Sequence, residues 1–404
     1  MYLKLAFRNI FRQKRRSLLT FIAMLGGFTL ASISIAWQDG TYIRVIEMFT
    51  RVMVGHIQMH KGDYLDKPSL YKNIENYEEV VAKINENPKV KECSPRVLTG
   101  GLAAVGEHTA GVQIIGIDPK LEDAATSFNN RIKEGKPLAS NAQNQALLGT
   151  SLADFLEAGI GDSVVIISQA ADGSMANDIY QIAGLYSSGN KQADRAIMYL
   201  HIDDAQEVFV LEGKVHEILV NLNSIRKVSQ VKQALEDKFA GTNLKVQSWK
   251  TVAASFYKSM QADRNSGYFT YAIIMAIVAV GILNTVVMNV LERTKEFGVL
   301  KALGTRPGRI FSMIMVEVFI MAIASIIIGS ILSTGLVMIM QDVGVSLPDP
   351  MEVGGVVIDE FSPMLIHQQY WIPAILVIIM SMLVAIIPAV RASNIKPAEA
   401  LRSI

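Results

Sequence analysis

The residues of this chain that could do chemistry are few, and a phosphate-binding loop is the first possibility. Residues 184–191, GLYSSGNK, are superficially similar to such a loop in their glycines and serines. A phosphate-binding loop requires a lysine followed by serine or threonine, but Asn190 stands at the lysine position and neither residue follows Lys191. We interpret this stretch as surface or sheet. We expect that the chain is not an enzyme and that any energy source lies on another chain.

Metal-ligating residues are also isolated. His216 and Glu217 lack the second histidine of a zinc-binding helix. His56 and His60 are four residues apart, but they lie in the strand-like stretch GHIQMH, so this spacing does not place them on adjacent helical turns. Cys93 is the only cysteine, which excludes an internal disulfide and a cysteine cluster. The sequence predicts no metal site.

Glu317 is the one ionisable residue well within a long apolar run. Acidic groups inside a membrane are costly and often functional, as parts of proton relays or ion sites. This residue lies about two helical turns from the end of its run, where it could instead reach a basic partner on the preceding helix. We favour local pairing over a proton relay, because the spans contain no second buried acid or histidine to pass a proton on.

The short segment 291–310, LERTKEFGVLKALGTRPGRI, separates two long apolar runs. It reads as a helix, because Phe297, Leu300 and Leu303 recur on one face and Gly304 and Pro307 are stop signals. Its charge is mostly basic: Arg293, Lys295, Lys301, Arg306 and Arg309 against Glu292 and Glu296. An ordinary basic hairpin is the alternative, but we favour a short amphipathic helix at the mouth of a bundle, which a soluble partner could bind.

Four apolar runs decide the class of protein. The chain has 404 residues, 50% of them hydrophobic, and a net charge of only +1. A run of about 20 apolar residues spans the hydrocarbon core of a bilayer. Four such runs occur, at residues 17–37, 268–290, 311–340 and 371–390. Glu317 is the only charged residue in them. We predict a membrane protein with four transmembrane helices and a large α+β domain, residues 38–267, between spans 1 and 2.

Charge predicts the topology. Residues 1–16 contain six basic residues and no acid, with apolar residues at helical spacing, as in an amphipathic helix on the inner membrane surface. A cleavable signal peptide is the alternative, but the following apolar run is too long for it. The loop 291–310 and the tail 391–404 are basic, whereas residues 341–370 hold five acidic residues and no Lys or Arg. The positive-inside rule therefore places both termini in the cytoplasm and the large domain outside.

The large domain mixes strands and helices. A helix over 41–54 is expected to continue from span 1, and a helical stalk over 252–267 to lead into span 2. Val- and Ile-rich segments predict strands at 55–60, 102–105, 112–117, 146–148, 164–167, 179–185, 197–199 and 217–222. Helices are expected at 76–85, 151–158, 203–211 and 227–239. Residues 224–240 with 245–249 indicate a smaller α/β lobe, and residues 159–199 a mostly β lobe.

Small residues recur every four positions in two spans. Ser325, Gly329 and Ser333 form one ladder, and Gly27 and Ala31 form a shorter one. Such ladders allow helices to approach closely, either within a chain or in a dimer. Both alternatives remain open from the sequence.

Two stretches resemble a known family. ERTKEFGVLKALGTRPGRIF at 292–311, with Glu317 beyond it, and PAVRASNIKPAEALR at 388–402 resemble the permeases of type VII ABC transporters. This family includes the macrolide exporter MacB, the cell-division protein FtsX and the lipoprotein-release subunits LolC and LolE. The opening LAFRNIFRQKRRSLLT, the segments 112–119 and 147–165, and Trp249 extend the resemblance over nearly the whole chain.

The resemblance implies a mechanism without a transmembrane conduit. Residues 291–310 would match the coupling helix, which docks on a cytoplasmic ABC ATPase present in two copies. ATP and Mg would bind to that ATPase, and no cofactor to this chain. Two permease chains would pair as a homo- or heterodimer and relay ATP-driven motion to their outer domains. The expected coupling residues are Glu292, Arg293, Thr294, Lys295, Glu296, Phe297, Gly298, Leu300, Lys301, Leu303 and Gly304.

The layout of the chain favours one branch of the family. MacB carries its ATPase fused at the N-terminus, whereas this chain begins sixteen residues before its first span, and FtsX-type outer domains are smaller. The resemblance therefore favours lipoprotein release from a bacterial inner membrane, with lipoprotein, a periplasmic carrier and membrane lipid as partners and no nucleic acid. The alternatives are an FtsX-like transmitter that activates a periplasmic partner and MacB-like export of drugs or peptides.

Overall fold

The computed structural model describes residues 14–353 and 356–397, which form two compact units. The helical unit comprises Met1–Ile43, Met260–Ser346 and Glu360–Ile404, and the sheet unit comprises Arg44–Ser259 and Leu347–Asp359. The amphipathic helix expected over 1–16 lies almost entirely outside the described residues, as does the end of the basic tail.

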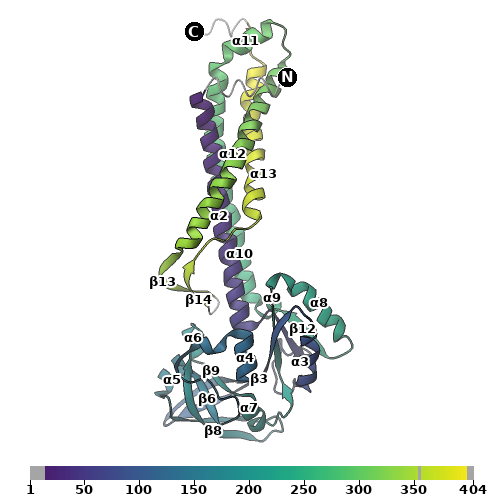
Figure 1. Cartoon of the computed structure of the whole chain (residues 1–404), viewed down its shortest axis with the longest axis vertical. Helices are drawn as coiled ribbons and strands as arrows, with labels where there is room; N and C mark the ends of the chain where they lie inside the picture. The colour runs from purple at the N-terminus through teal and green to yellow at the C-terminus, as the bar shows by residue number, and fades with distance from the viewer. Residues whose placement is uncertain (1–13, 354–355, 398–404) are drawn as a thin grey trace. The chain divides into compact units, whose positions relative to one another are not determined.

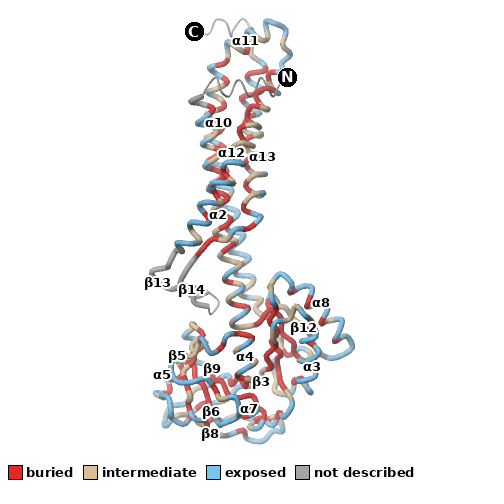
Figure 2. Tube along the Cα trace, in the orientation of Figure 1, coloured by how far each residue is buried: buried red, intermediate tan, exposed pale blue. Residues whose placement is uncertain are grey.

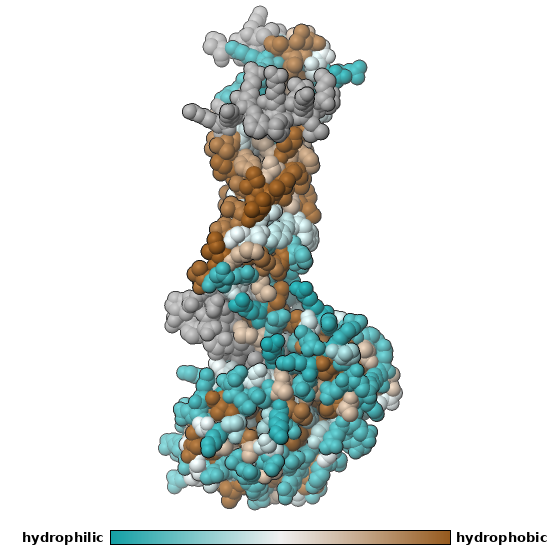
Figure 3. All heavy atoms as spheres, in the orientation of Figure 1, coloured by the Kyte–Doolittle hydropathy of each residue, from teal (hydrophilic) through white to brown (hydrophobic). Residues whose placement is uncertain are grey.

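Four long helices form the helical unit (Figure 1). They are α2 (Lys14–Phe49), α10 (Ala254–Glu292), α12 (Pro307–Val343) and α13 (Gln368–Ser393), and each is long and apolar enough to cross a membrane. Each apolar run of the sequence lies inside one of them. Apolar side chains dominate the visible surface of these helices, whereas polar ones dominate that of the sheet unit (Figure 3). The helices extend past the apolar runs because polar residues continue the helical conformation at their ends.

The small-residue ladders are used within the chain. A Cβ atom at Gly329 of α12 would lie 2.5 Å from the ring of Phe28 in α2, and one at Gly27 would lie 2.2 Å from Val278 in α10. The Ser32 hydroxyl donates to the Ser333 hydroxyl over 3.1 Å. Helix α2 therefore packs closely against both α12 and α10, because no side chain separates the backbones at these positions.

The sheet unit is built on one ten-stranded sheet. Its order is β12-β1-β11-β3-β4-β9-β6-β8-β5, with β7 pairing with β3 and β8. Most pairs are antiparallel, and β4–β9 and β6–β8 are parallel. The strands are β1 (Ile57–Lys61), β3 (Val90–Val105), β4 (His108–Ile117), β5 (Ile132–Gly135), β6 (Gln145–Gly149), β7 (Ser163–Gln169), β8 (Met175–Tyr186), β9 (Ile197–His201), β11 (Glu217–Leu222) and β12 (Leu244–Ser248).

Seven short helices and two small two-stranded sheets accompany it. The helices are α3 (Tyr77–Asn85), α4 (Pro119–Thr126), α5 (Thr150–Leu156), α6 (Lys191–Asp194), α7 (Ile202–Val208), α8 (Val228–Lys238) and α9 (Trp249–Val252). The small sheets pair β2 (Ile74–Glu75) with β10 (Lys214–Val215), and β13 (Val345–Val353) with β14 (Val356–Phe361). Buried residues, drawn red in Figure 2, line the strands and the helix faces that cover them.

Each strand and helix expected in this unit overlaps an observed one, and the two expected lobes share one sheet. The sixteen-residue strand β3 pairs with β11 from Val90 to Arg96 and with β4 from Arg96 to Val105. Both expected lobes are therefore built on one continuous sheet. Helix α4 and the β13–β14 hairpin were not expected. The α4 signal was present, since the Asp118 side chain caps the helix and Pro119 occupies its first turn.

Candidate functional site

The segment 291–310 contains a separate helix, α11 (Thr294–Ala302), between α10 and α12. Gly304 has φ of +87°, and the Gly304 and Thr305 amides donate to carbonyls of the last helical turn. Pro307 then occupies the first turn of α12. Both stop signals of the sequence are therefore used. The expected apolar face is corrected at one position, because Leu303 lies beyond the helix end and is 79% exposed.

A buried ion pair fixes the first end of α11. The Arg293 Nη1 atom lies 2.9 Å from the Glu317 Oε2 atom of α12, and the residues are 5% and 3% exposed. Asn289 donates to the other Glu317 oxygen over 3.4 Å, and Arg293 also contacts Glu296 at 3.1 Å. The Arg293 guanidinium lies 5.1 Å from the centre of the Phe297 ring. Glu317 thus has the basic partner that the local-pairing interpretation expected, placed at the junction of α10 and α11.

Lys301 fixes the second end. Its Nζ atom donates to the carbonyl oxygens of Ser393 and Ile395 over 2.8 and 2.9 Å. These carbonyls lie at the C-terminus of α13, where helix carbonyls lack partners within the helix and a cation is favourable. Helix α11 is therefore attached to α12 through Arg293 and to α13 through Lys301.

The other residues expected in the coupling segment divide into two sets. Phe297 and Gly298 are buried, and Thr294, Glu296 and Leu300 are half-buried. The exposed set consists of Glu292, Lys295, Leu303 and Gly304. Leu291 and Val299, which the sequence did not single out, are apolar and 53% and 46% exposed. Asn289, Ser393 and Ile395 were also missed, because two of them act only through backbone carbonyls that no sequence pattern marks.

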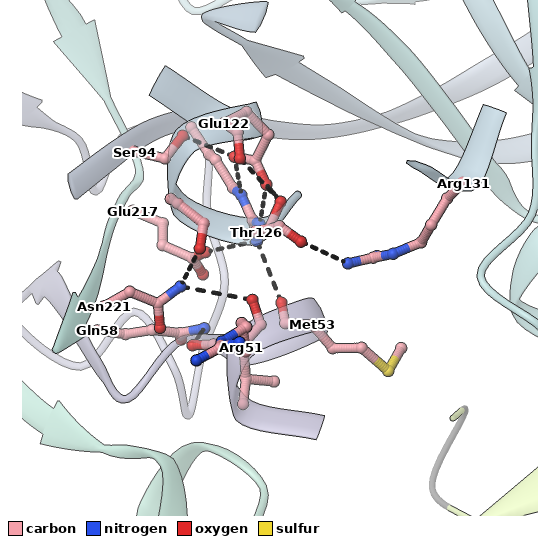
Figure 4. Close-up of polar contacts among 12 residues, drawn as sticks. Arg51, Met53, Gln58, Ser94, Glu122, Thr126, Arg131, Glu217 and Asn221 are labelled. Atoms are coloured by element: carbon pink, nitrogen blue, oxygen red, sulfur yellow. Dashed lines mark hydrogen bonds and ion pairs between the residues drawn. The ribbon is translucent and has the colours of Figure 1, made fainter. Parts of the chain in front are cut away.

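A second polar site lies in the sheet unit, where α2 ends. The helix passes into a π-helical turn, Thr50–Val54, and the Thr50 hydroxyl donates to the Ile46 carbonyl over 2.7 Å. Three side chains donate to backbone carbonyls of this turn (Figure 4). They are Asn221 to Arg51 (3.4 Å), Arg96 to Met53 (3.4 Å) and Gln58 to Val54 (2.8 Å).

Arg96 is itself held by two buried carboxylates. It makes two hydrogen bonds to Glu122, of 2.6 and 3.0 Å, and one to Glu217 of 3.1 Å. Glu122 also accepts from Ser94 (2.6 Å) and Thr126 (3.1 Å). Bidentate Arg–carboxylate contacts of this kind are strong and directional.

The pKa values of this cluster favour the charged forms. Burial acts to raise the pKa of Glu122 and Glu217, but their ion pairs and hydrogen bonds outweigh it and lower both. Burial acts to lower the pKa of Arg96, yet the two carboxylates raise it above its ordinary value. The cluster therefore stays charged at neutral pH.

The three histidines considered above, His56, His60 and His216, are buried in the sheet unit. The His56 Nδ1 atom accepts from the Leu222 amide over 3.2 Å, and burial lowers its pKa. The His60 Nε2 atom lies 3.3 Å from Glu217. His216 accepts from the Leu98 amide and contacts the Leu70 carbonyl. Within the described ranges, no three His, Cys, Asp or Glu residues are placed to hold a metal ion together.

The phosphate-loop-like stretch 184–191 spans the end of β8 and the start of α6. The buried Asp194 carboxylate accepts from the Ser188 amide (2.8 Å) and from the hydroxyls of Ser187 (2.9 Å) and Ser188 (2.6 Å). A side-chain anion already occupies the donors that a bound phosphate would use.

Comparison with known proteins agrees with this architecture. Residues 17–238 match the MacB-like periplasmic core domain, and residues 268–397 match the FtsX-like permease C-terminal family. The chain is 24% identical over 343 residues to the lipoprotein-releasing system transmembrane protein LolC of Xylella fastidiosa, and the match covers 81% of each chain. It is 21% identical over 402 residues to the corresponding LolE of Haemophilus influenzae, covering 93% of this chain and 92% of that one.

Among solved structures, the periplasmic region of MacB from Actinobacillus actinomycetemcomitans aligns with 53% of this chain and 98% of that one. The sequence identity is 13% and the TM-score is 0.39. The first of the two family matches alone spans more than half of the sequence. The protein therefore belongs to the family of ABC transporter permeases with a MacB-like periplasmic core domain and an FtsX-like permease domain, and is a multi-pass membrane protein.

Proposed function

We propose that this chain is the permease subunit of a type VII ABC transporter. In this transporter, a separate cytoplasmic ATPase hydrolyses ATP, and the permease converts the hydrolysis into movement of the sheet unit outside the membrane. The attachment of α11 carries the proposal. The segment 291–310 exposes Lys295 and Leu303, and its helix α11 is joined to α12 by Arg293 and to α13 by Lys301. A push on α11 would therefore reach two membrane helices.

The orientation follows from charge. The basic loop 291–310 and both termini lie in the cytoplasm, and the sheet unit lies outside. ATP and Mg bind to two copies of the ATPase, and a second permease chain completes the assembly. The occupied donors of residues 184–191 support the assignment of ATP to the partner.

Lipoprotein is the proposed cargo. The curated relatives LolC and LolE, which match this chain over most of its length, are named as lipoprotein-releasing system proteins. The site of action is then a bacterial inner membrane, and a periplasmic carrier would receive the released lipoprotein.

Affinity purification of the full chain in mild detergent tests the proposal. We expect a P-loop ATPase to co-purify with the native chain and to be lost from the double variant Lys295→Glu/Leu303→Glu. The control is Ile160→Glu, which, like Leu303→Glu, introduces one glutamate at an exposed apolar residue; Ile160 is 49% exposed and lies in the sheet unit. Full retention of the ATPase by the double variant, or no ATPase with the native chain, would overturn the proposal. A co-purifying lipoprotein supports the cargo, whereas a cell-wall hydrolase supports the FtsX-like alternative.

A further inference from the structure

The end of α2 is held by hydrogen bonds from buried side chains of the sheet unit. The last carbonyl groups of any helix lack partners within the helix and are satisfied by side chains, water or a tightened last turn. Here the partners are protein side chains: Gln58 is 4% and Asn221 1% exposed. The donors come from β1, β11 and β3, which are neighbours in the sheet. Each of three adjacent strands thus binds one carbonyl of the same helical turn.

We propose that Gln58, Asn221 and Arg96 are positioning residues, which make the end of α2 a rigid joint that passes movement of the first span to the sheet. This inference rests on the proposed function and deepens it. The residues touch neither nucleotide nor cargo. They act by preventing the helix end from sliding or fraying when the helix moves.

The π-helical turn explains why side-chain donors are needed. π-helical turns are rare and shift backbone hydrogen bonds out of the regular pattern. The Thr50 hydroxyl donates to the Ile46 carbonyl. It also lies within hydrogen-bond distance, 3.3 Å, of the Glu47 carbonyl. Such hydroxyl contacts loosen the helical ladder locally. The carbonyls of Met53 and Val54 are then satisfied by Arg96 and Gln58, so that the widened turn is held in one geometry.

The Arg96 cluster makes this joint stiff. Glu122 and Glu217 hold the guanidinium in place, and Glu122 is in turn held by Ser94 and Thr126. A buried donor that is fixed by several other contacts loses little additional freedom when it binds the Met53 carbonyl. The Arg96 contact to this turn is therefore made by a side chain that is already fixed.

The start of α10 differs. A break at Ala253, with φ of −104° and ψ of 50°, separates α9 from α10. Its side-chain contacts include two aromatic pairs: Phe256 stacks on Phe49 of α2 at 4.0 Å between ring centres, and Tyr257 packs edge-on against Trp249 of α9 at 5.5 Å. Aromatic contacts are tolerant of small rotations, whereas hydrogen bonds weaken steeply with angle. We assign α2 as the rigid connection between a membrane span and the sheet, and α10 as the compliant one.

Gln58→Met is the central test, because methionine keeps the length of the side chain and removes the donor. Gln206→Met is the matched control: Gln206 is also buried, and it donates to the Lys214 carbonyl over 2.9 Å within the same unit. The full chain, with its ATPase, is reconstituted in phosphatidylethanolamine–phosphatidylglycerol nanodiscs. Hydrogen exchange of residues 44–56 should rise roughly tenfold in Gln58→Met and not in the control. Equal exchange of residues 44–56 in Gln58→Met and in the Gln206→Met control would show that the Gln58 hydrogen bond does not hold the end of α2.

Spin-label distances then test the transmission. Labels are attached to cysteines that replace Glu47 on α2, Gln169 on β7 and Tyr268 on α10, in a Cys93→Ser background. The Glu47–Gln169 distance distribution should stay narrow in the native joint and broaden in Gln58→Met and Asn221→Leu. The change in the Tyr268–Gln169 distance on adding ATP and vanadate should fall at least twofold in these variants.

The two proposals fail in different ways. If the native joint shows no nucleotide-dependent change in the Tyr268–Gln169 distance, the proposed function fails. If the native joint shows that change and Gln58→Met and Asn221→Leu show the same amplitude, the positioning role is wrong while the transporter assignment stands. The Gln206→Met control excludes a general loosening of the sheet unit as the cause.

Discussion

Two buried arginines, one in each unit, hold a helix in place by different means. Arg293 pairs with Glu317 and contacts the half-buried Glu296, and a cavity of about 10 Å³ lies beside the pair. Arg96 is bound by two buried carboxylates, which hydroxyl groups and His60 hold in turn. The first arrangement has fewer hydrogen-bonded members. The second is a dense network.

The proposed function requires one chain to combine movement with transmission, and this difference would permit both. A pair with few hydrogen-bonded partners can change its geometry while few other groups move, although packed interiors resist large displacements. A network in which each member is held by others moves as a unit. We therefore expect Arg293 to lie where α11 adjusts to its partner and Arg96 to lie where the sheet unit follows α2.

Arg96→Met should have the largest effect, because it leaves Glu122 and Glu217 buried without a cationic partner. Removing one member of a buried ion pair costs about 3–5 kcal/mol of unfolding free energy. Chemical denaturation of the full chain in detergent, followed by the fluorescence of Trp249 in a Trp37→Phe/Trp371→Phe background, measures it. Glu122→Gln with Arg96→Met should recover part of the loss. A loss below about 1 kcal/mol for Arg96→Met would show that the network is not a stabilising one.

Acidification should break the same network without a mutation. The pKa values of Glu122 and Glu217 are lowered in the folded state, so their stabilisation is complete above the unfolded value near 4.5 and is lost as pH falls through the folded values. Stability of the sheet unit should thus be flat at neutral pH and decline below about pH 4.5. In Arg96→Met the decline should be shallower, because Arg96 is the main cause that lowers the pKa of Glu122 and, after the His60 hydrogen bond, a further cause that lowers the pKa of Glu217. Parallel pH profiles of the two proteins would contradict this.

Glu317→Gln should have a smaller effect than Arg96→Met. The amide can still bind Asn289 and Arg293, and Arg293 retains Glu296, so we expect a loss of about 1–3 kcal/mol in the helical unit. ATP hydrolysis by the associated ATPase should lose its dependence on the permease. The swap Arg293→Glu/Glu317→Arg should restore more coupling than either single change. If neither single change alters the ATPase rate, the pair serves stability alone.

The fold was largely predictable from the sequence because its signals are local. Apolar runs of span length and Val- and Ile-rich segments between turn residues each mark one element. The single sheet was not predictable, since β3 joins both expected lobes through pairings with β11 and β4 that are distant along the chain. Non-local pairing leaves no mark in either strand alone. Leu303 was misplaced because the helix end at Gly304 removed it from the apolar face.

The candidate sites were predictable only in part. Basic charge and helical spacing marked the α11 segment, and Glu317 stood out as a lone acid in an apolar run. Nothing in the sequence marked Gln58 or Asn221, because an amide in a strand is ordinary and its carbonyl partner depends on the fold. A buried arginine, Arg96, was equally invisible, since no local pattern distinguishes a strand residue that meets two distant carboxylates.

Lys301→Met should have the smallest effect on stability. It tests whether the attachment of α11 to α13 can loosen while its attachment to α12 stays intact. It removes the donor to the Ser393 and Ile395 carbonyls but leaves the Arg293 pair intact, so the expected loss is about 0.5–1 kcal/mol. Hydrogen exchange of residues 388–397 should rise, while that of residues 286–298 should not. Lys301→Arg should restore protection, because a guanidinium can also donate to helix carbonyls. If exchange rises equally in both segments, the two attachments of α11 loosen together. Helix α11 would then be held as one network, as the end of α2 is by Arg96, and the contrast between the two arginine sites would be wrong.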